Sequence, residues 1–295
     1  MNNLKNKIMM KLRNLTIMLA VAVLTFSVSS CTNSGAKKEE KKQVSIFYPN
    51  WAEGIAFSYL AKAALEENGF EVELTNLEPG LIYGELSKDN SKGDVFLDAW
   101  LPFTHKEYWA DYGDKLVKLG ESFSEGTTGL VVPSYVTINS IEELNANKDK
   151  FDSEIIGIGG GAGIHANTVK AIEEYKLDFE QITSSGPAMV ASLEKAIKKN
   201  EWIAVTGWKP HFMWAKNDLK YLEDTKGVYP KDACTIISRR GFEEDLPVAA
   251  TFFKNFNLKE QQLYGLMSAI EKNGEEAGAQ EWYKANKTLV DAWLN

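Results

Sequence analysis

Strand-like and helix-like runs alternate through most of this chain of 295 residues. In the first part, strands are predicted at 44–48, 70–74 and 94–99, and helices at 55–68 and 81–87 lie between them. This β-α-β-α-β order is typical of a mainly parallel sheet whose faces are covered by helices. The chain is therefore predicted to be an α/β protein.

Two extended segments interrupt this alternation. Residues 129–136 contain Pro133, which is unfavourable in a central strand but compatible with a crossover between two units. Residues 233–238 are a second crossover candidate, and the tail at 246–294 is predicted to be helical. Between the crossovers the alternation restarts, with elements predicted at 140–145, 154–158, 166–175, 188–199 and 202–206. This arrangement predicts a two-lobed clamshell with lobe I at 44–134 plus 235–295 and lobe II at 135–234.

The first thirty residues are typical of a signal peptide. Four basic residues precede an apolar run at 15–26 that is too short to span a bilayer comfortably. The Val-Ser-Ser-Cys sequence ending at Cys31 resembles a bacterial lipobox, in which the cysteine is acylated and becomes the new N-terminus. Residues 31–43 are polar and charged, so we expect a flexible tether between a lipid anchor and the folded part.

Charge and cysteine content narrow the function classes. The net charge is −8, and loss of the four basic residues of the signal peptide leaves the mature chain near −12. Nucleic-acid binding needs a basic footprint, so this class is excluded. Once Cys31 is acylated, Cys234 is the only other cysteine and has no disulfide partner. We expect it to be a small buried residue.

Three tryptophans share one local setting, because each follows a strand-like run and precedes a turn or helix signal. They are Trp51, Trp100 and Trp208. In an open α/β sheet, the carboxyl ends of the strands form the ligand crevice. Three indole rings meeting there would form the cage that a desolvated quaternary ammonium needs. The other five tryptophans are expected to be structural: Trp109, Trp202, Trp214, Trp282 and Trp293.

A glycine-rich run at 157–164 lies between a predicted strand and a predicted helix. Backbone amides at a helix start can bind an anion. The run can also be aligned with the dinucleotide motif through Gly157, Gly159 and Ala162, but the acidic residue that this motif requires is not evident. A carboxylate is therefore the favoured anion.

The three histidines of the chain are assigned different roles. His105 follows Trp100 by five residues, so its imidazole can reach the same crevice and donate to a carboxylate. His211 is expected to stabilise its own loop, and His165 to cap the helix after the glycines. No close pair of histidines suggests a metal site.

The sequence resembles the glycine betaine/proline betaine-binding proteins of ABC importers from about residue 44 to the C-terminus. The matching motifs are Asp98-Ala99-Trp100-Leu101-Pro102-x-Thr104-His105, Gly161-Ala162-Gly163-Ile164, Ser184-Ser185-Gly186-x-Ala188-Met189 and Gly207-Trp208-x-Pro210-His211. The resemblance implies the type II periplasmic-binding-protein fold.

In that family, three tryptophans surround the trimethylammonium group, and two backbone amides with a histidine hold the carboxylate. The resemblance assigns these roles to the following residues of this chain: Trp51, Trp100 and Trp208 to the cation, and Gly163, Ile164 and His105 to the carboxylate.

The resemblance further implies a binding protein with no reaction, no cofactor and no metal. Its partners would be a small zwitterionic ligand, an ABC permease with its ATPase, and a membrane reached through the lipid anchor. The protein would lie outside the cytoplasm, in the periplasm or on the outer face of the plasma membrane. Two alternatives stay open: the same fold binding carnitine, choline or a sulfonium zwitterion such as dimethylsulfoniopropionate, and a nucleotide-dependent α/β enzyme.

Overall fold

The computed structural model describes residues 42–295. The predicted signal peptide, nearly all of the tether and Cys31 therefore lie outside the described residues. Within the described range, no helix combines the length and the apolar character needed to cross a membrane.

The first part of the described chain forms a parallel β-α-β-α-β unit, as predicted. Strand β1 (Gln43–Tyr48) pairs in parallel with β2 (Glu71–Asn76) on one side and with β3 (Val95–Leu101) on the other. The connecting helices are α2 (Ala52–Glu67) and α3 (Pro79–Leu86). All seven residues of β3 are buried, which fits a strand covered on both faces.

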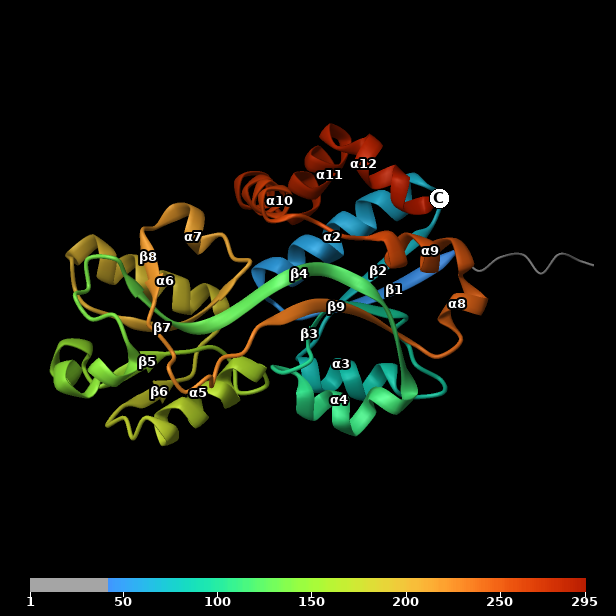
Figure 1. The fold of residues 1–295 in the computed structure, drawn as a ribbon. Helices are drawn as coiled ribbons and strands as arrows, with labels where there is room; N and C mark the ends of the chain where they lie inside the picture. Colours follow the sequence, from blue (N-terminus) through green and yellow to red (C-terminus); the bar gives the residue numbers. More distant parts are fainter. Residues whose placement is uncertain (1–41) are drawn as a thin grey trace, which may run out of the picture. The chain divides into compact units, whose positions relative to one another are not determined.

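Two strands at the centre of the sheet are antiparallel to their neighbours. Strand β9 (Asp232–Arg239) pairs with β3 and with β4 (Leu116–Pro133), and β4 continues to pair with β7 (Ala204–Lys209) and β8 (Leu219–Tyr221). Figure 1 shows β4 running alongside β9 and on toward β7. The predicted crossover at 129–136 overlaps only the C-terminal end of β4, which ends at Pro133, and the crossover at 233–238 lies within β9.

The second part repeats the parallel arrangement. Strand β5 (Glu154–Ile156) pairs in parallel with β6 (Glu180–Ile182) and with β7. Helices α5 (Gly163–Glu174) and α6 (Gly186–Lys199) follow β5 and β6. The helix predicted at 140–145 is a 3-10 turn, Ile141–Glu143, and a second 3-10 segment covers Asn145–Phe151. The sheet order is β2-β1-β3-β9-β4-β7-β5-β6.

The C-terminal tail is helical, as predicted, and returns to the first part. Helix α2 packs against α10 and α11, and Figure 1 shows the last helices gathered beside it. Trp293 is buried among Phe252 and Phe256, with ring centroids 5.9 Å and 4.7 Å away. The remaining elements are α4 (Lys106–Tyr112), a 3-10 turn (Gly113–Lys115), α7 (Met213–Lys216), α8 (Phe242–Asp245), α9 (Pro247–Asn255), α10 (Glu260–Asn273), α11 (Glu275–Ala285), α12 (Lys287–Asp291) and a final 3-10 turn (Ala292–Leu294).

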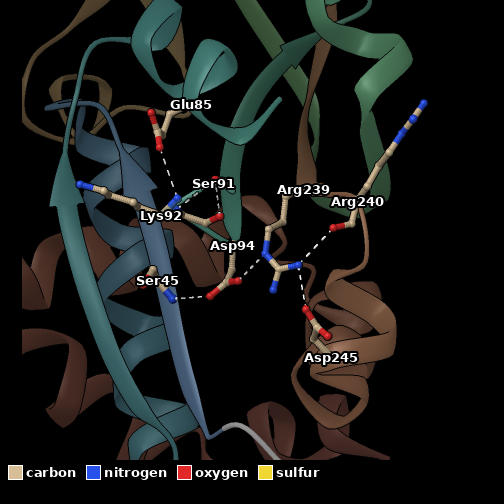
Figure 2. Close-up of polar contacts among 9 residues, drawn as sticks. Ser45, Glu85, Ser91, Lys92, Asp94, Arg239, Arg240 and Asp245 are labelled. Carbon is tan, nitrogen blue, oxygen red and sulfur yellow. Dashed lines mark hydrogen bonds and ion pairs between the residues drawn. The ribbon is translucent and has the colours of Figure 1, made fainter. Parts of the chain in front are cut away.

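A buried ion pair holds the amino end of β3 to the carboxyl end of β9. Arg239 Nε donates to Asp94 Oδ1 at 2.8 Å, and the backbone amide of Ser45 donates to Asp94 Oδ2 at 2.9 Å (Figure 2). Arg239 also contacts Asp245 of α8 at 3.0 Å. Both partners of the main pair are largely buried, so the two charges and the amide donor together fix the register of β1, β3 and β9.

Together these elements confirm the predicted fold class, a two-part α/β architecture of the type II binding-protein kind. Each part has parallel outer strands flanked by helices. The two long antiparallel strands connect them at the centre. Cys234 lies in β9 and is fully buried, as expected from its apolar sequence context.

Candidate ligand-binding site

One cavity of about 260 Å³ brings together all six residues to which the sequence assigned a ligand. It lies where β3, β7, α2 and α5 meet. Its lining consists of Trp51, Glu53, Trp100, Thr104, His105, Thr128, Ile158, Ala162, Gly163, Ile164 and Trp208. The lining is predominantly apolar and aromatic with a few polar groups, which is the usual composition of a small-molecule site.

The three tryptophans reach this cavity from three different elements. Trp51 is the N-cap residue of α2 and is half-buried. Trp100 and Trp208 are the penultimate residues of β3 and β7, and each is only 3% exposed. Both side chains are therefore packed within the sheet and are not exposed on the turns that follow.

Trp208 is held by a carboxyl group that the sequence reasoning missed. Its indole Nε1 donates to Glu53 Oε2 at 2.8 Å, a contact between β7 and the first turn of α2. Glu53 is fully buried, and burial raises the pKa of its carboxyl group to about 8. Its other oxygen, Oε1, has no hydrogen-bond partner among residues 42–295. The cavity wall thus carries an acidic group beside an aromatic ring.

His105 presents a single free N–H donor to the cavity. The backbone amide of Trp100 donates to His105 Nδ1 at 3.0 Å, so Nδ1 is an acceptor and the ring proton resides on Nε2. Burial lowers the pKa of His105 to about 3, which keeps the imidazole neutral. Nε2 is buried and has no partner within the described part of the chain. It can therefore donate to an anion in the cavity.

The amides of Gly163 and Ile164 begin helix α5, as the glycine-run argument requires. A helix N-terminus leaves its first amides without intrahelical acceptors and carries partial positive charge. A Cβ on Gly163 would lie 2.1 Å from the carbonyl oxygen of Thr104, so only glycine permits this close approach. The approach brings the start of α5 against the loop that carries His105.

Asp232 fixes the loop between Trp100 and His105. Its carboxylate accepts from the amides of Phe103 at 2.6 Å and Thr104 at 3.0 Å. The Thr104 hydroxyl also donates to it, at 2.5 Å. Three donors to one carboxylate add to the backbone hydrogen bonds of this loop, such as that from the Lys106 amide to the Phe103 carbonyl at 3.1 Å, and order it.

Two of the other sequence assignments can be checked in the same region. His211 stabilises its own loop, as expected, because its Nδ1 accepts from the amide of Met213 at 3.1 Å. The expectation for His165 is wrong. The N-cap residue of α5 is Ala162, with no side-chain cap, and His165 lies inside the first turn. The amides that open the helix are therefore left available.

Sequence reasoning missed three residues that form or support the site: Glu53, Thr128 and Asp232. Glu53 lies in the first turn of a helix, where an acidic residue is favoured by the helix dipole even when exposed. Thr128 stands opposite Trp208 in the β4–β7 register, a pairing that no local pattern reveals. Asp232 acts through contacts across about 130 positions of sequence.

The OpuAC family model, the substrate-binding domain of ABC-type glycine betaine transport systems, matches residues 42–285. The chain is 38% identical over 165 residues to the glycine betaine/carnitine transport binding protein GbuC of Listeria monocytogenes. That match covers 53% of this chain and 55% of the relative, so it spans about half the length of each protein.

Two solved structures extend the similarity to nearly the whole described chain. Lactococcal OpuAC, in its closed-liganded conformation complexed with glycine betaine, is 34% identical with a TM-score of 0.80, covering 86% of this chain and 100% of the other. The glycine betaine/L-proline-binding protein ProX of Borrelia burgdorferi is also 34% identical, with a TM-score of 0.82, covering 86% of this chain and 97% of the other.

Proposed function

The chain belongs to the family of substrate-binding domains of ABC-type glycine betaine transport systems, and on that premise we propose that it is the extracytoplasmic receptor of an importer for betaine-type zwitterions. The observation that carries this proposal is the convergence of Trp51, Trp100, Trp208, His105, Gly163 and Ile164 on one cavity. Each ligand group then has a matching set of side chains or amides.

The quaternary ammonium is assigned to the three tryptophans. A methylated cation cannot donate hydrogen bonds, so π-faces and a nearby carboxyl group are its natural partners. Desolvated cation–π contacts are worth about 2 kcal/mol for each ring, or roughly 6 kcal/mol for three. Glu53, hydrogen-bonded to Trp208, adds an acidic group to the same wall.

The carboxylate is assigned to the amides of Gly163 and Ile164 and to His105 Nε2. Within residues 42–295 none of the three donors has an acceptor, and hydrogen bonds to a charged group contribute about 1.5–3 kcal/mol each. Ordering and desolvation costs oppose these gains. Micromolar affinity, about −8 kcal/mol, is within this range.

The charge beside the glycine run argues against a nucleotide. The Glu78 carboxylate lies within 3.1 Å of where a Cβ on Gly161 would stand. A pyrophosphate there would face a negative charge rather than a nest of free amides. A solute receptor without enzymatic activity is the better fit.

Isothermal titration calorimetry tests both the ligand preference of the site and the role of its tryptophans. Glycine betaine, proline betaine, carnitine, choline and dimethylsulfoniopropionate are titrated into the purified protein and into Trp51→Ala. We expect betaine binding that Trp51→Ala weakens by roughly 30-fold, the equivalent of about 2 kcal/mol. Trp202→Ala is the matched control, because Trp202 packs against Phe151 in a separate core cluster. Equal weakening by both variants would refute the cage.

The membrane anchor is part of the proposal and has its own test. We propose that Cys31 is acylated and that the tether lets the domain deliver its ligand to a permease with its ATPase. Cys31→Ser should move the protein from the membrane fraction to the soluble exported fraction, with betaine affinity unchanged. Retention in the membrane fraction would rule out the lipid anchor.

A further inference from the structure

Two buried carboxyl groups, Glu53 and Asp98, lie beside the tryptophans, and no basic residue among 42–295 is paired with either of them. We propose that Glu53 and Asp98 retain a proton in the free protein and release it when a quaternary ammonium enters the cavity, so that ligand capture is coupled to proton release. The coupling rests on the proposed function, because the entering cation is the ligand assigned to the tryptophans.

Glu53 is the member of the pair that meets the ligand. It is fully buried, lines the cavity, and uses only Oε2 to accept from Trp208. Oε1 is buried with no partner in residues 42–295. A polar atom buried without a partner is costly, and an adjacent cation would relieve that cost.

Asp98 lies directly behind the helix turn that carries Glu53. A Cβ on Gly54, the residue after Glu53, would be 3.0 Å from Asp98 Oδ2. Asp98 is fully buried, and among residues 42–295 its polar neighbours are the neutral Cys234 thiol and the Trp100 side chain, with no basic residue paired to it. It lies in the cavity-forming strand β3, two residues before Trp100.

The other buried aspartate near β3 shows what Asp98 lacks. Asp94 has Arg239 at 2.8 Å and the Ser45 amide at 2.9 Å, as Figure 2 shows. Asp98 stands four positions further along the chain and has no such ion pair among the described residues. A buried carboxylate with an arginine partner can stay ionised, whereas one without a partner retains its proton.

The groups facing the pair do not supply the missing charge. Cys234 approaches the pair from β9 and Tyr83 from α3, and Asp232 lies near both of these residues. Burial and the neighbouring carboxyls raise the pKa of Cys234, and burial keeps His105 neutral. The facing groups are therefore neutral or acidic.

Burial and mutual repulsion push both carboxyl groups in the same direction. Burial raises the pKa of Glu53 to about 8, and burial together with Glu53 raises the pKa of Asp98 well above its usual range. Two adjacent carboxyl groups in a dry site do not both ionise, and they titrate as a pair. At neutral pH the free protein therefore holds at least one proton on them.

A bound onium changes this balance and fixes the sign of the pH dependence. Its positive charge favours the ionised form of Glu53, so the bound protein holds fewer protons than the free protein. Affinity must then rise with pH, by up to about tenfold per pH unit for one proton, and level off above the pKa of the free pair. His105, which donates to the ligand carboxylate, stays neutral above about pH 5. Its titration therefore does not oppose the rise of affinity with pH.

Calorimetry in buffers of different ionisation heat counts the protons directly. Glycine betaine is titrated at pH 7 in two such buffers, and then at a series of pH values up to pH 9. We expect about one proton released per ligand in the wild type and affinity that rises until about pH 8. Glu53→Gln keeps an oxygen for Trp208 and should abolish both effects, whereas Glu67→Gln, at an exposed carboxylate at the other end of the same helix, should leave both intact.

The outcomes separate this inference from the proposed function. Betaine binding without proton release, or a pH slope that survives in Glu53→Gln, would overturn the proton coupling and leave the receptor assignment standing. Failure of every quaternary ammonium to bind would overturn the assignment itself. Ligand-free tryptophan fluorescence gives a second check, since Trp208 reports on Glu53: an inflection between pH 7 and 9 is expected in the wild type and lost in Glu53→Gln.

Discussion

The strand ends that carry Trp100 and Trp208 are two versions of one local design, one in each part of the molecule. In both, the tryptophan is the penultimate residue of a buried strand, and a cis proline follows two residues later. A histidine then comes after the proline, His105 in the first case and His211 in the second. Both histidines are buried, and burial lowers the pKa of each to about 3.

The two histidines nevertheless do different work. His105 Nδ1 accepts from the amide of Trp100, which leaves Nε2 at the cavity. His211 Nδ1 accepts from Met213, and its ring packs edge-on against Trp208 at 4.7 Å, outside the cavity lining. Two additional residues in the first loop carry its histidine back to the tryptophan amide. Loop length, rather than residue type, decides which imidazole can reach a ligand.

Removing either indole should produce the largest loss of glycine betaine affinity. Similar losses in the two variants would show that both tryptophans contribute equally to cation binding. Trp100→Ala and Trp208→Ala each lose a cation–π contact of about 2 kcal/mol, so glycine betaine affinity should fall by at least roughly 30-fold in each. Calorimetry measures the loss, and circular dichroism verifies that the fold is retained. Unchanged affinity in either variant would exclude that ring from the cage.

Phenylalanine at the same positions should reveal where the two turns differ. Trp208→Phe keeps a ring but removes the indole Nε1 that donates to Glu53 at 2.8 Å. The Trp100 side chain lies near Asp98, but no donor among residues 42–295 reaches the Asp98 oxygens with ordinary hydrogen-bond geometry, so Trp100→Phe removes a weaker contact. We expect Trp208→Phe to lower affinity further than Trp100→Phe by about 1–3 kcal/mol, the penalty of a buried polar group without its partner. Equal losses would show that the Glu53 contact is irrelevant to binding.

Alanine at each histidine should separate ligand binding from loop stability. His105→Ala removes a donor to the carboxylate and should weaken glycine betaine binding by about 1.5–3 kcal/mol, roughly 10- to 150-fold. Choline has no carboxylate, so it should bind the wild type far more weakly than glycine betaine, and His105→Ala should narrow that difference. His211→Ala should lower the melting temperature while changing betaine affinity little. A loss of affinity in His211→Ala as large as that in His105→Ala would erase the proposed distinction.

The sequence was a good guide where the signal is local. The strands around Val44, Val95 and Ala204 are short apolar runs bounded by turn signals, and each lies within a few residues of its predicted place. The first half of β4 was missed because Lys118, Gly120 and charged neighbours break the alternation there. Its pairing with β9 is also interrupted by register shifts. Strand β6 has only three residues and gives too short a pattern to detect.

The site was predictable to the extent that side-chain type implies chemistry. Tryptophans at strand ends predict a cation site, and glycines and a histidine beside a helix start predict an anion site. The role of Glu53 was not predictable, because the sequence around it does not show whether a first-turn glutamate faces solvent or a buried indole. That depends on which distant strand packs against α2, and the register of β7 decides it.

The smallest expected effect concerns acid stability, where the two histidines should behave alike. For each, the folded pKa of about 3 lies below the ordinary value of 6.5, so the folded state binds fewer protons than the unfolded state. The stability present above pH 6.5 is therefore lost as pH falls toward 3, by about 1.4 kcal/mol per pH unit for each histidine. His211→Gln and His105→Gln should each remove one such term. Between pH 7.5 and 5.5 the wild-type melting temperature should fall about 2–4 °C further than that of either variant. The Glu53–Asp98 pair is common to all three proteins, so its contribution cancels in the comparison. If the melting temperature of one variant falls as much as that of the wild type, the replaced histidine is already protonated in the folded protein.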